Sequence, residues 1–424
     1  MTAIASELEQ KGRIAKAASR KLATLPSAVK DRALLAIAEA LAAQTDAIVA
    51  ANAVDVADAR DNGLDEHLVD RLLLTPSRIV GMAADVRAVA ALTDPVGETI
   101  DMRQLPNGLQ VGRRRVPLGV IGTIYESRPN VTVDIATLCL KSGNAVILRG
   151  GKEAIRSNTA LARLLQDAIA GVGVPEGAVQ LVESTDRALV GEMLRMRDVI
   201  DLMIPRGNAD LIRRVYEEAT MPVVAGGIGV CHTYVDATAD LGMARDIVVN
   251  AKTRRYSICN ALDTLLVDRA VGQNHLPPIA RALVESGVEL RCDPEAGAVL
   301  EWSGIPFVPA VEEDFGTEFL ALRAAVRLVD GIEGALAHIE EYGSGHSEAI
   351  VTENYGNAQR FLDEVDAAAV YVNASTQFTD GAQFGLGAEV GISTQKMHAR
   401  GPMGLRELTS YKWIIYGEGQ TRPV

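Results

Sequence analysis

Cys259 is the side chain in this sequence whose type and surroundings best suit covalent chemistry. It ends the segment 250–259, NAKTRRYSIC, which follows a helix-like stretch and precedes a strand-like run. Lys252, Arg254 and Arg255 lie nearby in the sequence, and positive charges favour the thiolate, the nucleophilic form of cysteine. A free cysteine is more often a small buried hydrophobic residue. Spacing alone therefore favours the buried interpretation and leaves the catalytic one open.

The other residue types that often carry chemistry show weaker patterns. Cys139, Cys231 and Cys292 are widely spaced and form no CxxC pair, which predicts neither a disulfide scaffold nor a zinc site and favours a reducing compartment. Histidine and glutamate are dense between residues 338 and 348 but lack a regular ligand spacing, so a solvated helix end is the better interpretation. We predict no metal site. The GxGxxG dinucleotide fingerprint after a first strand is also absent.

The composition predicts a soluble, cytoplasmic protein of two or three domains. Of the 424 residues, 48% are hydrophobic and 23% are charged, and a chain of this length exceeds a single core. The net charge of −13 argues against nucleic-acid binding, which needs a basic face. Glu7 and Glu9 stand where a signal peptide would be apolar, and the longest uncharged run, 219–235, is shorter than a usual membrane span. We interpret that run as a buried strand with a glycine-rich loop, and expect no membrane association.

The order of the expected elements predicts an α/β fold. Residues 1–92 carry apolar side chains at helical spacing. The Asn107-Gly108 turn signal predicts an antiparallel hairpin over 99–116. Apolar runs then alternate with helical stretches, as in a parallel sheet covered by helices. The predicted strands are 116–125, 145–148, 179–182, 202–204 and 223–224, and the predicted helices are 131–142, 155–171, 186–196 and 207–219.

A second alternating region follows the first. Its predicted helices are 240–258, 277–287, 331–341 and 355–365, and its predicted strands are 262–268, 288–291, 306–308, 348–352 and 368–373. The tail 405–424 contains YKWIIY at 411–416, a run that suits an edge strand or a strand between subunits.

Several segments resemble the aldehyde dehydrogenase superfamily. Residues 119–132, GVIGTIYESRPNVT, are similar to the strand and loop that end in its oxyanion-hole asparagine, and 141–153, KSGNAVILRGGKE, to its cofactor-phosphate segment. Residues 259–267, CNALDTLLV, resemble the catalytic-cysteine segment of one branch, the γ-glutamyl phosphate reductases, also called glutamate-5-semialdehyde dehydrogenases. FGLGAEV at 384–390 and STQKMHARGPMG at 393–404 resemble the signature of that branch. Before the cysteine the chain departs from it, with TRRYS at 253–257 where the branch usually has TQRPS.

The resemblance implies a reaction and assigns Cys259 a role. It implies NADPH-dependent reduction of L-glutamate 5-phosphate to L-glutamate 5-semialdehyde and phosphate, the second step of proline biosynthesis from glutamate, with glutamate 5-kinase as functional partner. Cys259 would form a thioester, and the Asn130 side chain and the Cys259 N–H would stabilise the oxyanion. Hydrolytic relatives carry a glutamate base where this chain has Ala225, flanked by Val224 and Gly226. A reductase needs no activated water, so the missing base supports the phosphate-dependent reaction.

The resemblance also assigns binding residues. Arg149 and Lys152 offer positive charge for the 2′-phosphate of NADPH, although solvated charges at a strand end are the alternative. The other cofactor-binding residues that it implies are Pro205, Arg206, Gly207, Gly226, Gly227 and Glu318. By charge and position, the candidates for substrate binding are Arg128, Arg206, Lys252 and Arg255 for the anionic groups and Glu126 for the ammonium group.

The expected architecture is aldehyde dehydrogenase-like, with two parallel-sheet α/β domains and a small β oligomerisation element. Residues 1–101 and 117–226 would form the NADPH-binding domain and 227–400 the catalytic domain. Residues 102–116 and 401–424 would form the oligomerisation element of a homodimer or homotetramer. Three alternatives stay open: an aldehyde-oxidising dehydrogenase, a thiol acyltransferase or hydrolase without nicotinamide, and a scaffold protein without activity.

Overall fold

A computed structural model of the chain describes residues 6–422, so the outermost ends of the predicted NADPH-binding domain (1–5) and oligomerisation element (423–424) lie outside the described residues. The chain divides into two compact units. The first contains the chain up to Ala225, Gly385–Gly391 and the segment from Met403 onward, and the second contains Gly226–Phe384 and Ile392–Pro402.

The first unit is built on a four-stranded parallel sheet with the order β5-β4-β3-β6. Its strands are β3 (Val120–Tyr125), β4 (Ala145–Gly150), β5 (Val179–Leu181) and β6 (Leu202–Arg206). Every residue of β3 is buried, as expected for a strand covered by helices on both faces. The chain runs outward from β3 through β4 to β5 and then returns to place β6 on the other side of β3. This reversal creates a topological switch point at the carboxyl ends of β3 and β6, where α/β sheets bind ligands.

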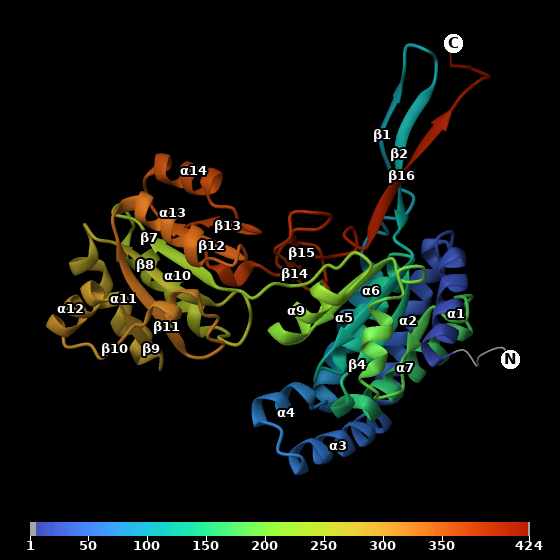
Figure 1. The fold of residues 1–424 in the computed structure, drawn as a ribbon, viewed down its shortest axis with the longest axis horizontal. Helices are drawn as coiled ribbons and strands as arrows, with labels where there is room; N and C mark the ends of the chain where they lie inside the picture. The colour runs from blue at the N-terminus through green and yellow to red at the C-terminus, as the bar shows by residue number, and fades with distance from the viewer. Residues whose placement is uncertain (1–5, 423–424) are drawn as a thin grey trace. The chain divides into compact units, whose positions relative to one another are not determined.

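Helices cover this sheet and pack on one another (Figure 1). They are α1 (Glu7–Leu22), α2 (Ser27–Ala43), α3 (Thr45–Asp61), α4 (Glu66–Leu72), α5 (Pro76–Ala91), α6 (Asn130–Lys141), α7 (Ile155–Ala170), α8 (Ala188–Met193) and α9 (Ala209–Glu218), with the 3₁₀ turn η1 (Lys152–Ala154). Local signals begin several of them: Ser6 and Glu9 form a capping box at α1, and Thr75 caps α5 ahead of a proline in the first turn. Among the described residues no single helix is long and apolar enough to span a bilayer, although α2 and α3 together, bent by 70° at their junction, pass by length and composition.

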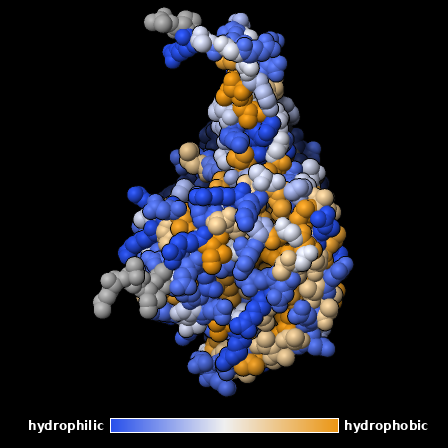
Figure 2. Space-filling view, turned by 90° about the vertical axis from the view of Figure 1, so that its right-hand side faces the viewer, coloured by the Kyte–Doolittle hydropathy of each residue, from blue (hydrophilic) through white to orange (hydrophobic). Residues whose placement is uncertain are grey.

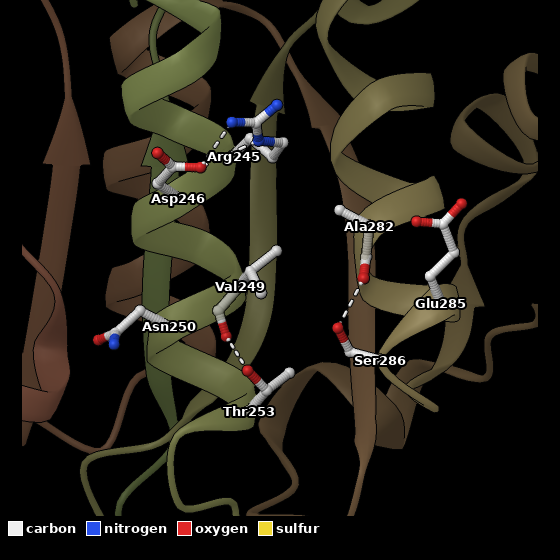
Figure 3. A pocket seen from close by; sticks show the side chains of 8 residues that line it. All are labelled: Arg245, Asp246, Val249, Asn250, Thr253, Ala282, Glu285 and Ser286. Carbon is white, nitrogen blue, oxygen red and sulfur yellow. Dashed lines mark hydrogen bonds and ion pairs between the residues drawn. The ribbon is translucent and has the colours of Figure 1, made fainter.

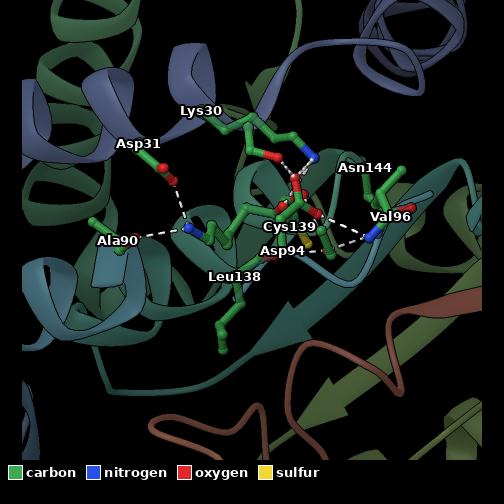
Figure 4. A network of polar contacts seen from close by, with 11 residues as sticks. Lys30, Asp31, Ala90, Asp94, Val96, Leu138, Cys139 and Asn144 are labelled. Atoms are coloured by element: carbon green, nitrogen blue, oxygen red, sulfur yellow. Dashed lines mark hydrogen bonds and ion pairs between the residues drawn. The ribbon is translucent and has the colours of Figure 1, made fainter. Parts of the chain in front are cut away.

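A buried polar network fixes α6 against α2 and α5 (Figure 4). The Lys30 ammonium lies 2.5 Å from an Asp94 carboxylate oxygen and also donates to the carbonyl of Lys141 at 3.2 Å. The Lys141 ammonium in turn contacts Asp31 at 2.5 Å and donates to the carbonyl of Ala90 at 2.7 Å. Because buried charges are costly unless they are paired and hydrogen-bonded, this network specifies how the three helices pack.

The predicted hairpin and tail form a three-stranded antiparallel sheet with the order β1-β2-β16. Its strands are β1 (Thr99–Gln104), β2 (Gln110–Pro117) and β16 (Thr409–Tyr416), and β16 pairs with β2 along all eight of its residues. The tail is therefore an edge strand, as predicted. Figure 2 shows hydrophobic side chains along this sheet, and Trp413, Ile415 and Tyr416 are more than half exposed.

The second unit contains a seven-stranded parallel sheet with the order β10-β9-β11-β8-β7-β12-β13. Neighbouring residues of one strand serve opposite faces: Leu265 and Val267 pack with α10, α11 and α12, whereas Leu266 packs with α13 and α14. The strands are β7 (Cys231–Val235), β8 (Leu262–Asp268), β9 (Glu289–Cys292), β10 (Val308–Pro309), β11 (Arg323–Val329), β12 (Ser347–Val351) and β13 (Ala369–Val372), and a two-stranded sheet joins β14 (Ile392–Ser393) to β15 (Gly401–Pro402). The helices are α10 (Leu241–Thr253), α11 (Gly272–Glu285), α12 (Pro294–Trp302), α13 (Gly331–Tyr342) and α14 (Tyr355–Glu364), with the 3₁₀ turns η2 (Glu312–Gly316) and η3 (Thr376–Phe378).

The structure confirms the alternating α/β pattern and corrects some of its details. The helix predicted over 240–258 ends at Thr253, because the Gln377 amide donates hydrogen bonds to the carbonyls of Ala251 and Arg255. The helix α12 was not predicted. The strand predicted at 223–224 is reduced to one bridge between Met203 and Val223.

One segment of the predicted catalytic region packs with the first unit instead. Gly385–Gly391 belongs there because Val390 and Gly391 exchange backbone hydrogen bonds with Met403 at 2.8–2.9 Å. A Cβ on Gly387 would also collide with Leu92, so the loop packs closely on the helical part of the same unit.

We expect replacement of Gly81 by alanine to stabilise the first unit by about 0.5–1 kcal/mol. Gly81 is exposed within α5, and a Cβ added there meets no heavy atom within 4 Å, so alanine removes the entropic cost of a helical glycine without new strain. Chemical unfolding curves of the two proteins measure the effect. Gly63→Ala is the matched control: it has equally open space but a φ of +74°, so it should destabilise. A stabilising Gly63→Ala would contradict the conformational argument.

Candidate active site

Cys259 lies on the loop between α10 and β8, where its backbone is held on two sides. The chain passes so close at Gly229 that a Cβ there would lie 1.7 Å from the Cys259 carbonyl oxygen, and only glycine fits. The Cys231 thiol lies 3.2 Å from the same oxygen and donates to it. Cys259 itself is half-buried, whereas Cys139, Cys231 and Cys292 are buried. Partial exposure with a fixed backbone suits a nucleophile better than a core residue.

The residue after the cysteine anchors the loop to η3. The Asn260 amide donates to the carbonyls of Gln377 and Thr379 at 3.3 and 3.0 Å, and the Asn260 carbonyl accepts a hydrogen bond from the Thr376 hydroxyl at 2.7 Å. These contacts, between residues 116 or more apart in sequence, hold the loop against η3. No local pattern signalled Thr376, Gln377 or Thr379 as part of the site.

The unusual residues before the cysteine lie at the surface of this loop. The Arg254 guanidinium donates to the Gln377 side-chain oxygen at 3.1 Å, which places its charge on η3. Arg255 is exposed, and Tyr256 is 42% exposed. The exposure of Arg255 is compatible with its predicted role in binding an anion.

Lys252 does not have the accessible position expected of a substrate-binding residue. Its side chain is 0% exposed, and its ammonium lies 3.4 Å from a carboxylate oxygen of Asp263. The same oxygen accepts the N–H of Phe319 at 3.1 Å. Burial lowers the pKa of Lys252 and raises that of Asp263 to about 6. The predicted contact of Lys252 with substrate is therefore corrected. Its side chain instead forms a buried ion pair with Asp263 that joins α10 to β8.

Glu318 contacts the glycine-rich segment that approaches the cysteine. A Glu318 carboxylate oxygen accepts the N–H of Gly229 at 3.1 Å, so the structure brings two predicted features together, the Glu318 side chain and the Cys259 loop. Gly226 pairs with Ser393 through an isolated bridge, and a Cβ on Gly227 would press on Thr394 at 2.7 Å. Gly227 thus permits close packing within the second unit.

In the first unit, Asn130 is the first residue of α6 and is held by the next turn of that helix. Its amide donates to a carboxylate oxygen of Asp134 at 2.8 Å. Burial raises the pKa of Asp134 to about 7; the charge of Asp85 adds to the rise, and the Asn130 amide and Arg206 oppose it. One Asn130 N–H is therefore occupied by Asp134, and an amide has a second N–H for another acceptor.

We expect Asp134 to make the stability of the first unit pH-dependent. In the folded protein this carboxyl keeps its proton up to about pH 7, because its pKa lies well above that of an aspartate in the unfolded chain. Its contribution to stability is therefore fully present below about pH 4 and is lost as the pH rises to about 7. The free energy of unfolding of Asp134→Asn and of the unsubstituted protein should be measured at pH 5 and pH 8. The variant should gain stability relative to the unsubstituted protein at pH 8. Asp210→Asn, at a side chain 84% exposed, is the control. Equal shifts for both variants would contradict the assignment.

Several predicted residues gather at the switch point of the first sheet. Pro205 and Arg206 end β6, and Gly207 follows them next to Glu126, the residue after β3. A Glu126 carboxylate oxygen accepts the N–H of Asn208 at 3.0 Å, and a Cβ on Gly207 would collide with that carboxylate. Glu126 therefore holds the turn after β6, which gives it a structural role beside the predicted contact with an ammonium group.

The end of β4 offers a cationic group that suits a phosphate. The Arg149 Nε is buried and has no hydrogen-bond partner among the described residues. Burial lowers the pKa of Arg149, and the charges of Arg187 and Arg214 lower it further against the opposing effect of Glu153. Lys152 is exposed in η1, and Arg128 is half-buried in the loop after β3. A half-buried arginine whose Nε has no partner could bind an anionic group, which is compatible with the predicted role of Arg149.

None of the predicted site residues lines the pocket in Figure 3. It is an open hollow between α10 and α11, and its hydroxyl groups are bound within their own helices: Thr253 to the carbonyl of Val249 and Ser286 to that of Ala282. It is lined by Arg245, Asp246, Val249, Asn250, Thr253, Ala282, Glu285 and Ser286. Among the side chains that the structure describes, no group of three or more histidine, cysteine, aspartate or glutamate residues could hold a metal ion.

Comparison with known proteins assigns the chain to a family. The aldehyde dehydrogenase family matches residues 2–301. The chain is 58% identical to a γ-glutamyl phosphate reductase of Dehalococcoides mccartyi, over 98% of each chain, and 57% identical to one of Moorella thermoacetica, over 99% of each. The chain belongs to the γ-glutamyl phosphate reductase family. The crystal structure of a γ-glutamyl phosphate reductase from Thermotoga maritima has a TM-score of 0.96 and 47% identity, covering 99% of this chain and 100% of that one.

Membership of the γ-glutamyl phosphate reductase family confirms the predicted resemblance and the aldehyde dehydrogenase-like fold. The chain is therefore an oxidoreductase of the aldehyde dehydrogenase family. The roles assigned above to Cys259, Asn130, Glu318 and Arg149 remain predictions about individual residues.

Proposed function

We propose that this protein catalyses the NADPH-dependent reduction of L-glutamate 5-phosphate to L-glutamate 5-semialdehyde and phosphate, the second step of proline biosynthesis from glutamate. The names of its relatives support the substrate. The observation that carries the proposal is the half-buried Cys259, whose backbone is held by Gly229 and Asn260.

In the proposed mechanism, the Cys259 sulfur attacks the acyl carbon of the substrate. A carbon–sulfur bond forms, the bond from that carbon to the phosphate oxygen breaks, and phosphate leaves with the electron pair. Bound NADPH supplies the hydride that reduces the resulting thioester. The thiohemiacetal then releases the aldehyde and returns the thiol. Ala225 stands where hydrolytic relatives carry a base, so water is not activated against the thioester.

Asn130 and the backbone N–H of Cys259 stabilise the oxyanion in this proposal. Each tetrahedral species carries negative charge on the former carbonyl oxygen, and a donor aimed at that charge is typically worth about 3 kcal/mol. The bond from Asn130 to Asp134 supports this role, because it restricts the rotation of the amide before substrate arrives.

NADPH rather than NADH is the proposed cofactor, and Arg149 is the residue that we expect to select it. Replacement of Arg149 by alanine should raise the Kd for NADPH by about tenfold or more and change that for NADH little, because only NADPH carries the 2′-phosphate. Titration of the nucleotide fluorescence measures both constants. Arg163→Ala, at an exposed side chain of α7, is the control. Equal losses for NADPH and NADH would contradict a 2′-phosphate contact.

The proposed reaction is tested directly in both directions. Forward turnover is followed as NADPH loss with L-glutamate 5-phosphate generated in situ by a kinase. In reverse, oxidation of the semialdehyde with NADP⁺ should require inorganic phosphate. Full-rate oxidation without phosphate would instead identify an aldehyde-oxidising dehydrogenase, and the absence of any nicotinamide turnover would favour an acyltransferase or a scaffold protein.

We further propose a cytoplasmic homodimer or homotetramer that receives its substrate from glutamate 5-kinase. The open edge of β16, with its exposed aromatic and aliphatic side chains, supports the pairing of copies, because an unpaired strand edge is a template for a further strand.

A further inference from the structure

A second cysteine of the second unit contacts the backbone of the proposed nucleophile. Cys231 is the first residue of β7 and is 0% exposed. Its sulfur lies 3.2 Å from the Cys259 carbonyl oxygen, a hydrogen bond in which the thiol is the donor. Burial, followed by the charges of Glu348 and Asp263, raises the pKa of the Cys231 thiol well above its usual range, so the donor keeps its proton.

The pairing of the sheet is irregular beside Cys231. The pairing of β7 with β8 shifts register between Cys231 and His232: Cys231 pairs with Leu262, but His232 pairs with Thr264. The extra residue, Asp263, lies on β8, and bulges are frequent beside active sites. The irregularity therefore lies at the point where β7 meets the strand that follows the Cys259 loop.

A chain of buried polar groups contacts the Cys231 thiol. The Cys231 sulfur lies 3.8 Å from Nδ1 of His346, which is 2.8 Å from the Ser347 hydroxyl. The Ser347 hydroxyl lies 2.7 Å from that of Thr379, whose carbonyl accepts the Asn260 amide at 3.0 Å. Burial lowers the pKa of His346 to about 4, so its ring is neutral near pH 7. The chain thus begins at the Cys259 carbonyl and returns to the residue that follows it.

We propose that Cys231 is a positioning residue whose thiol holds the Cys259 carbonyl and thereby fixes the backbone from which the nucleophile projects. The inference rests on the proposed role of Cys259. Gly229 limits how close the chain can come, and the Cys231 hydrogen bond limits how far the carbonyl can turn away. Holding a reacting group in its productive geometry contributes substantially to the rate of an enzyme. A displacement of about 1 Å lowers that rate about 10²-fold.

Three variants at position 231 separate the donor from the volume. Cys231→Ala removes the donor and leaves a small space, Cys231→Val removes the donor and fills the space, and Cys231→Ser keeps an O–H donor. We expect kcat to fall about tenfold or more in the alanine and valine variants, with the KM for NADPH unchanged. In the serine variant, kcat should regain at least half of that loss on a logarithmic scale. Cys292→Ala, at another buried cysteine of the same unit, is the matched control and should change kcat less than twofold.

A measurement that does not depend on turnover completes the test. The rate at which iodoacetamide alkylates Cys259, read by peptide mass spectrometry across pH 6–9, should change in the alanine and valine variants and not in Cys292→Ala. If Cys231→Ala does not fold, the valine variant decides. Folded donor-free variants with unsubstituted kcat and alkylation rates would overturn the positioning role, as would a serine variant that is no better than valine. A Cys259→Ser protein that still turned over would instead overturn the proposed function.

Discussion

Replacement of Cys259 by serine should lower kcat for the reduction of L-glutamate 5-phosphate by about 10⁴-fold or more. A serine hydroxyl needs a neighbouring base to act as a nucleophile, whereas a thiol ionises near neutral pH without one. In the proposed mechanism, loss of the group that forms the covalent intermediate removes the whole route rather than one contribution to it. NADPH loss with substrate generated in situ measures the effect.

The cofactor site and the fold should survive this substitution. Cys259→Ser should bind NADPH with an unchanged Kd and unfold at the same denaturant concentration, because the thiol and hydroxyl differ little in size and the loop is held through backbone groups. Cys292→Ser, in β9, is the control for cysteine loss in the same unit. A serine variant within tenfold of the unsubstituted kcat would show that hydride reaches the substrate without a thioester at Cys259.

Replacement of Gly229 by alanine should lower kcat by about 10²-fold although no reacting group is removed. The added Cβ would lie 1.7 Å from the carbonyl oxygen, 2.6 Å from the carbonyl carbon and 2.9 Å from Cα of Cys259. These are backbone atoms and cannot rotate away, so either the 226–229 segment or the Cys259 loop must move. A shift of about 1 Å at the nucleophile is enough for a loss of this size.

The same substitution should also disturb Glu318, because the Gly229 N–H is its hydrogen-bond donor. We therefore expect slower alkylation of Cys259 by iodoacetamide together with the loss of kcat. Gly81→Ala makes the same chemical change where no atom lies within 4 Å and should leave both rates unchanged. Activity within twofold of the unsubstituted protein in Gly229→Ala would mean that the close approach does not constrain the cysteine.

The two substitutions differ in what they test. Cys259→Ser concerns the identity of the nucleophile, which the motifs at 119–132 and 259–267 already suggested. Gly229→Ala concerns its position, which depends on a contact that no motif showed. The run 219–235 was predicted to be a buried strand with a glycine-rich loop, and the strand was predicted at 223–224. The structure corrects this, because strand β7 begins after the glycines, at Cys231. The reason for the glycine became visible only once the Cys259 carbonyl was found against it.

The sequence by itself determined the features that depend on near neighbours along the chain. Helical spacing, alternating apolar runs and the Asn107-Gly108 turn predicted most elements, because periodicity and turn chemistry act over a few residues. Motif resemblance identified Cys259 as the candidate nucleophile, since the residue types around it form one continuous segment. The helix predicted over 240–258 extended a local pattern too far. The distant side chain of Gln377 binds the carbonyl of Ala251 near the end of the observed helix.

Only the tertiary structure decided which distant residues meet. The strand order of the second sheet brings Cys231 to a carbonyl 28 residues away and Glu318 to an N–H 89 residues away. It also buried Lys252, whose charge suggested an exposed ligand, against Asp263. These outcomes depend on strand order and burial, which arise when the whole hydrophobic core assembles and are not encoded in the spacing of any one segment.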